Sequence, residues 1–148
     1  MEPFEYIACN GRNLALIIRT RMDPQETTFL TPNDFNFQLG FVVYPAGGEI
    51  TPHTHRPLER HIMGTSEALM IRKGRCFVDI YDDDRKLIAT RELHSGDVVL
   101  VVGGGHGYRM LENTTFLEIK QGPYTGLAEK ERFSVRSSDD LGSSEGNT

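Results

Sequence analysis

Short runs of strand-forming residues, separated by turn residues, constrain the fold of this 148-residue chain more than any other feature. Gly, Pro, Asn and Asp punctuate the chain between the runs, and these residues favour turns. Helical periodicity is confined to a single turn at residues 127–132. Roughly eight to ten short strands at regular spacing predict an all-β sandwich or barrel. The clearest runs cover residues 14–19, 35–43, 67–73, 75–81, 86–93, 97–102, 107–111 and 115–120.

Two of these segments carry specific patterns. Residues 35–43 (FNFQLGFVV) alternate large apolar residues with Asn, Gln, Gly and Val, which predicts a strand with one strongly apolar face. The run Asp82-Asp-Asp-Arg85 predicts a hairpin turn between two strands. Its three acids favour a solvated turn over a calcium site, because no EF-hand spacing follows them.

Composition excludes several classes of function. The chain is long enough for one core, and its last twelve residues, 137–148, are rich in Ser, Gly and acid, which predicts a disordered acidic tail. The formal charge of −5 argues against nucleic acid, which needs clustered Lys and Arg. No apolar run reaches the ~20 residues that cross a bilayer. The N-terminus has acids where a secretory signal has bases, so we expect a soluble cytoplasmic protein.

Two histidines one residue apart, His53 and His55, form the most suggestive polar pattern. On an extended segment, the two-residue period places both imidazoles on one face, about 7 Å apart at the backbone, where they can converge on one ion. A polar loop is the alternative interpretation. His106, after an apolar strand and three glycines, is the candidate third ligand, and Glu59 and Glu67 supply nearby carboxylates.

These residues fall at the spacing of a known family, and the chain resembles the cupins. Gly47, five residues and His53-Thr-His55 match the start of the first cupin motif, and Glu67, six residues and Gly74 match its end. The second motif is matched more loosely by Gly96 to His106. Val102 stands at the proline position, the gap before His106 is one residue shorter, and Met110 replaces the asparagine.

The resemblance covers roughly residues 35–120 and implies a double-stranded β-helix, or cupin barrel, at 35–122. We expect N-terminal strands at 1–34 to pack on that barrel and an extension to follow at 123–136. Cupins are often homodimers and hold a divalent metal inside the barrel by three histidines and a glutamate. The resemblance therefore implies a divalent metal in this chain, held by His53, His55, Glu67 and His106. Three imidazoles and a carboxylate suit Fe, Mn, Zn, Ni or Cu, and the ligand types do not choose among these ions.

The identity of the carboxylate ligand is open between two glutamates. Glu59 has the usual cupin distance from the histidine pair, whereas Glu67 has the right distance from Gly74. Strand register favours Glu67, since it then faces inward with Leu69 and Ile71. Residues 56–66 would form an enlarged loop at the barrel mouth, in which His61 is an exposed residue or a substitute ligand.

The predicted function is metal-dependent isomerisation, epimerisation or oxygenation of a small sugar-like or keto compound. Glu67 and Tyr108 are the candidate catalytic residues, as proton carrier and general acid. Tyr108 and Met110 share the parity of His106 and should face inward with it. Gln121 has the parity of Leu117 and Ile119 and is a candidate to reach the cavity from the end of its strand. The alternative is a metal-containing module that binds or senses a small ligand without turning it over.

Overall fold

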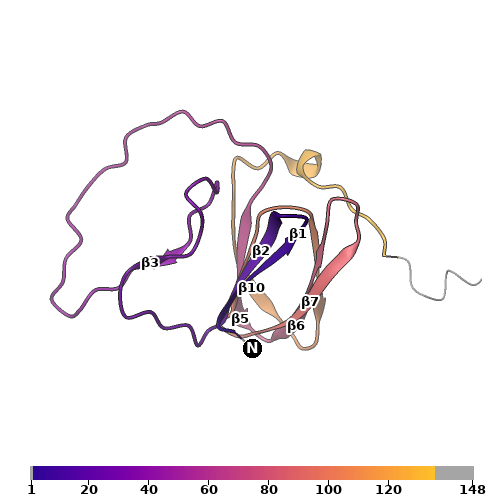
Figure 1. Cartoon of the computed structure of the whole chain (residues 1–148), viewed down its shortest axis with the longest axis horizontal. Coiled ribbons are helices and arrows are strands. Elements are labelled where there is room, and N and C mark those ends of the chain that lie inside the picture. The colour runs from indigo at the N-terminus through magenta and orange to yellow at the C-terminus, as the bar shows by residue number, and fades with distance from the viewer. Residues whose placement is uncertain (1, 136–148) are drawn as a thin grey trace, which may run out of the picture.

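The chain folds into antiparallel sheets, as the computed structural model describes it for residues 2–135 (Figure 1). Five strands form one sheet in the order β1-β2-β8-β5-β10, three form a second in the order β7-β6-β9, and β3 pairs with β4. The all-β prediction is therefore confirmed, but the sheets do not close into a continuous barrel. The strands are β1 (Phe4–Cys9), β2 (Arg12–Ile18), β3 (Thr28–Phe29), β4 (Gly40–Phe41), β5 (Glu67–Lys73), β6 (Arg75–Tyr81), β7 (Leu87–His94), β8 (Val98–Val101), β9 (Gly105–Met110) and β10 (Thr115–Lys120).

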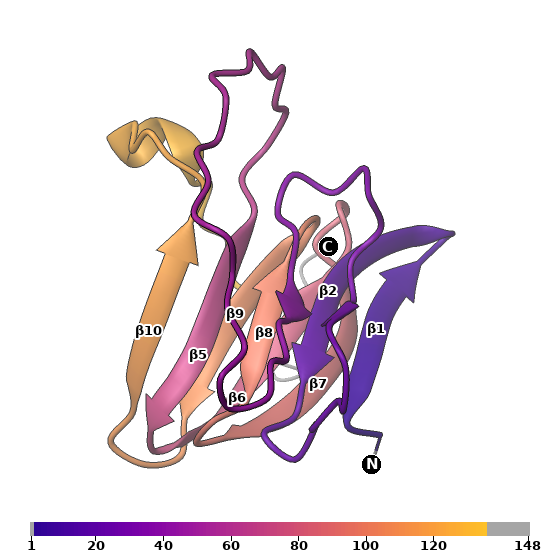
Figure 2. The ribbon, with the colours of Figure 1, turned by 90° about the vertical axis from the view of Figure 1, so that its left-hand side faces the viewer.

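The core lies between the five-stranded and three-stranded sheets (Figure 2). Strand β5 shows how the sequence builds it, because Glu67, Leu69 and Ile71 are buried while Met70 and Arg72 are exposed. This alternation confirms the register expected for residues 67–73. The two sheets contribute these buried apolar residues to one cluster: Ile7, Leu14, Leu69, Ile71, Val99 and Val101 from the first, and Cys76, Val78, Ile80 and Leu93 from the second.

The outer face of the five-stranded sheet has its own apolar cover. Leu16, Ile18 and Leu100 are buried there beneath side chains of the segment between β2 and β5. The sequence predicted a continuous strand at residues 35–43, and this is wrong, since only Gly40 and Phe41 pair, with β3. The predicted alternation is nevertheless present in the exposure of the side chains, since the large apolar residues are partly buried and the residues between them are mostly exposed. The covering side chains of the segment include Met22, Leu30, Phe37, Leu39 and Phe41.

The predicted turn at Asp82 is confirmed. Strands β6 and β7 pair on either side of it, and the Asp82 carboxylate accepts hydrogen bonds from the backbone N–H of Asp84 and of Lys86, both at 2.9 Å. The turn expected near residue 127 appears as a 3₁₀ helix, η1 (Gly126–Glu129). The predicted acidic tail, residues 137–148, lies outside the described residues.

Residues 44–65, here called the arm, leave the sandwich between β4 and β5 and return to it at Ser66. In Figure 1 the arm forms a wide excursion to one side of both sheets, and in Figure 2 its farthest part extends past the upper ends of β5 and β10. Every residue from 44 to 61 is exposed, and none belongs to a strand. Within residues 2–135, no helix has the length and apolar character needed to span a membrane.

Candidate functional site

A carboxylate and an imidazole meet at one end of the sandwich. Glu67 is the first residue of β5, in the five-stranded sheet, and His106 lies on β9, in the opposite sheet. The His106 Nε2 atom lies 2.7 Å from the Glu67 Oε1 atom, so the contact joins the two sheets. The Glu67 side chain is buried, whereas the His106 side chain is about one-third exposed. The pair therefore sits at the boundary between core and solvent.

The electrostatics of the pair keep Glu67 ionised. The hydrogen bond from His106 holds the pKa of Glu67 below its ordinary value, against burial, which acts in the opposite direction. A second carboxyl, Glu118 on β10, has a raised pKa, first through burial and then through its hydrogen bond with Glu67. The two carboxyls thus differ in acidity, and Glu118 is the one that holds a proton more readily.

Tyr108 extends this site toward the core. It lies two residues after His106 on β9, and its ring centroid is 5.8 Å from that of His106 and 5.2 Å from that of Phe116. Its Oη atom is buried and has no hydrogen-bond partner among the described residues. Burial, followed by the charge of Glu67, raises the pKa of Tyr108 strongly, so the hydroxyl stays protonated. A buried hydroxyl without a partner is uncommon and calls for a ligand or water.

His53 and His55 lie elsewhere, on the exposed arm. Their ring centroids are 5.2 Å apart, so the two imidazoles are neighbours, as the two-residue spacing predicts. The His53 Nδ1 atom lies 2.8 Å from the carbonyl oxygen of Thr51. With Nδ1 donating to that carbonyl, Nε2 is left with a free lone pair, the arrangement usual in histidines that bind metals.

The four expected metal ligands do not form one site within a single chain. Glu67 and His106 are in contact, while His53 and His55 are on the arm, and among residues 2–135 no three His, Cys, Asp or Glu side chains are grouped to hold an ion. The fold of one chain therefore brings together only two of the four expected ligands, Glu67 and His106. Glu59 and His61 are also on the exposed arm, away from any partner that the described residues supply.

On β10 the inward face is the opposite of the one we assigned. Leu117 and Ile119 are exposed, and Gln121 donates a hydrogen bond to the carbonyl of Gly122 at 2.8 Å. Phe116 packs on the core instead, so Glu118 shares its face and approaches Glu67. Sequence reasoning missed Glu118 because the apolar residues Leu117 and Ile119 suggested that their own face of β10 points inward, whereas both are exposed. The parity of Phe116 is the signal that identifies it.

On β9 the inward face is only partly as expected. Tyr108 packs on the core, whereas Met110, at the end of the strand, is half exposed.

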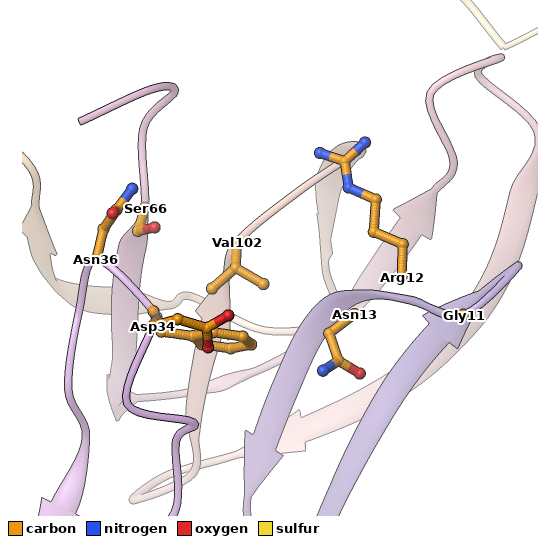
Figure 3. A pocket seen from close by; sticks show the side chains of 8 residues that line it. Gly11, Arg12, Asn13, Asp34, Asn36, Ser66 and Val102 are labelled. Atoms are coloured by element: carbon orange, nitrogen blue, oxygen red, sulfur yellow. The ribbon is translucent and has the colours of Figure 1, made fainter. Parts of the chain in front are cut away.

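A polar hollow of about 370 Å³ opens on the outer side of Ser66 (Figure 3). Asp34, Asn36 and Ser66 line one side and Arg12 the other. The Arg12 guanidinium already pairs with Asp83, and the hollow contains no buried titratable side chain. It is therefore a weaker candidate for chemistry than the pair formed by Glu67 and His106.

Comparisons of the chain with protein-family models, with curated proteins and with solved structures give no significant match. The functional argument accordingly depends on the residues and their geometry.

Proposed function

We propose that the chain is a cupin-type protein with a double-stranded β-helix, and that it isomerises or epimerises a small sugar-like or keto compound at Glu67 and His106. The glycines of the cupin motifs support the family assignment. Gly47, Gly74 and Gly96 have φ values of 84°, 93° and 90°, so each occupies a left-handed turn position that disfavours other residues. The spacing of the motif therefore coincides with the turns of the fold.

One observation carries the proposed chemistry: a buried carboxylate hydrogen-bonded to a partly exposed imidazole, beside a buried hydroxyl with no partner. A carboxylate that accepts from one ring nitrogen of histidine orients the ring and leaves the other nitrogen free to exchange protons. Here Glu67 holds Nε2 of His106, and Nδ1 takes or returns the proton next to a carbonyl carbon. Tyr108, which stays protonated, donates a hydrogen bond to the oxygen on which charge develops.

Proton exchange at carbon tests the proposal. The protein is incubated in D₂O with a panel of aldoses, ketoses and 2-keto acids, and ¹H NMR follows loss of the proton next to the carbonyl. We expect exchange with at least one compound, and a loss of about 100-fold or more in Glu67→Gln. Glu112→Gln, at an exposed carboxylate that pairs with Arg75, is the matched control and should retain the wild-type rate.

Two results would contradict the proposed enzymatic activity. A compound that binds without exchanging would identify a binding module, and an equal loss in Glu112→Gln would show that Glu67 has no special role.

A further inference from the structure

One wall of the polar hollow in Figure 3 carries a carboxylate on a braced turn. The backbone N–H of Phe35 donates to the carbonyl of Pro32 at 3.1 Å, and the Gln38 side-chain amide donates to both of these residues' carbonyls, at 2.8 and 3.0 Å. Asp34 stands on this turn. Among the residues that the structure describes, its carboxylate forms no ion pair. This wall therefore presents a negative charge at a fixed place.

The opposite wall carries the guanidinium of Arg12, which is also held in place. The group lies against the backbone of Gly103, where an added Cβ atom would be 2.9 Å from Arg12 Nη2. Arg12 Nη1 pairs with Asp83, on the side away from the hollow. A guanidinium has five N–H donors, so this pair leaves donors for a ligand. The planar fork of these donors matches the two oxygens of a carboxylate.

The rest of the lining is uncharged. Asn13, Asn36 and Ser66 supply amide and hydroxyl groups, and Val102 lies between the two walls (Figure 3). The Val102 side chain packs on the apolar cluster of the outer face, so the sheet supports the hollow from below. The volume of about 370 Å³ is within the range of small-molecule sites. The hollow thus suits a small ligand with charged ends.

We propose that this hollow binds a small zwitterion, with the ligand's carboxylate on Arg12 and its ammonium group on Asp34. Facing walls of opposite charge select such a ligand, because a simple acid would meet Asp34 and a simple amine would meet Arg12. The inference goes beyond the proposed function and does not depend on it. The hollow opens on the outer side of Ser66, whereas the Glu67 side chain is buried in the core.

Amide shifts in ¹H–¹⁵N NMR spectra of the full chain test the site. The protein is titrated with β-alanine, 4-aminobutyrate and glycylglycine, then with the N-acetyl and carboxamide derivatives of each, and with glucose. We expect at least one zwitterion to shift the signals of residues 12, 13, 34–36 and 66 saturably. Each derivative that lacks one charge should bind about tenfold more weakly or worse, since a hydrogen bond to a charged group is lost.

Three results of the titration would overturn the inference. The first is that no zwitterion of the panel shifts these signals. The second is that a derivative with one charge removed binds as tightly as its parent. The third is that glucose binds more tightly than every zwitterion, which would identify a site for polyols instead.

Substitutions of the two charged residues provide a second test. Asp34→Asn and Arg12→Gln should each weaken binding of the zwitterion about tenfold or more. Asp23→Asn is the matched control, because Asp23 is an exposed acid between β2 and β3 that does not line the hollow. It should bind as wild type does, and equal losses in Asp34→Asn and Asp23→Asn would overturn the inference.

A further variant separates the charge of Arg12 from its ion pair. Asp83→Asn removes the partner but keeps the guanidinium in the hollow, so binding should fall less than in Arg12→Gln. Equal losses in these two variants would contradict direct contact between Arg12 and the ligand. All the substituted side chains are exposed, and the ¹H–¹⁵N spectrum of each variant reports whether it is folded.

Discussion

At the scale of single residues, a buried ion pair ties three strands together. Arg19 Nη1 lies 3.0 Å from Asp97 Oδ2, and both side chains are less than 5% exposed. The Asp97 carboxylate also accepts hydrogen bonds from the backbone N–H of Thr20 at 2.9 Å and of His94 at 2.8 Å. The ends of β2 and β7 and the start of β8 thus converge on one carboxylate.

Replacing this carboxylate should be costly. Asp97→Ala leaves the Arg19 charge buried without its partner and orphans two backbone donors, so we expect a loss of about 3–5 kcal/mol in the free energy of unfolding. Urea denaturation measures it. Asp83→Ala removes a partner from the exposed Arg12 pair and should cost less than about 1 kcal/mol. Similar losses in the two variants would contradict the assigned role of Asp97.

A second residue-scale prediction concerns pH. Arg109 donates to both carboxylate oxygens of Asp79, at 2.7 and 2.9 Å, and these hydrogen bonds hold the pKa of Asp79 below its ordinary value of 3.8. A lowered pKa means that stability is present above the ordinary value and is lost as pH falls through the folded value. Asp79→Asn should therefore flatten the decline in unfolding free energy between about pH 5 and about pH 2, and Arg109→Gln should do the same. Curves parallel to wild type would contradict this.

The sequence predicted part of the site at this scale. Alternation along residues 67–73 placed Glu67 inward, and the parity of β9 placed Tyr108 in the core. The partners of Asp79 and Asp97 could not be predicted, because Arg109 and Arg19 are 30 and 78 residues away in the chain. Only the folded sheets determine such pairings.

At the scale of elements, Gly74 is required by the turn between β5 and β6. It has a φ of +93°, and a Cβ atom there would lie 2.2 Å from the carbonyl oxygen of Asn113. Gly11, in the turn between β1 and β2, has a φ of +76° but open space around the same position. Gly11→Ala should cost about 1–2 kcal/mol from backbone strain alone, and Gly74→Ala should cost clearly more. Equal melting temperatures for the two variants would contradict the steric argument.

The arm makes a separate prediction at this scale. Trypsin should cleave wild-type protein after Arg60, on exposed backbone, and not after Arg56, which Pro57 follows. Among the described residues, we expect this bond to be cut before the one after Arg91, because Arg91 lies on β7 and its backbone pairs with β6. Mass spectrometry identifies the fragments. Cleavage after Arg91 before Arg60 would contradict the exposure of the arm.

Strands flanked by clear turns were predictable. Residues 67–73, 75–81 and 115–120 match β5, β6 and β10, because Gly74, Asp82 and neighbouring turn residues end their apolar runs. Strand β1 was missed as a distinct run, since its residues are only partly buried and its pairing with β2 decides its conformation. At residues 35–43 the alternation reflects side chains that pack on the neighbouring sheet, and only Gly40 and Phe41 pair with another strand, β3.

At the scale of the whole molecule, the contact between Glu67 and His106 joins the two sheets of the sandwich at one end. The spacing of the cupin motifs pointed to both residues together with His53 and His55, but the two histidines lie on the arm and do not join them. The pair formed by Glu67 and His106 is accordingly the part of the predicted donor set on which the proposed function depends.

Proton exchange by Glu67→Gln tests this pair most directly. Wild type, Glu67→Gln and Glu112→Gln are incubated in D₂O with the same panel of carbonyl compounds and followed by ¹H NMR. We predict a loss of about 100-fold or more in Glu67→Gln and the wild-type rate in Glu112→Gln. A wild-type rate in Glu67→Gln, or an equal loss in Glu112→Gln, would contradict the role assigned to Glu67 and His106.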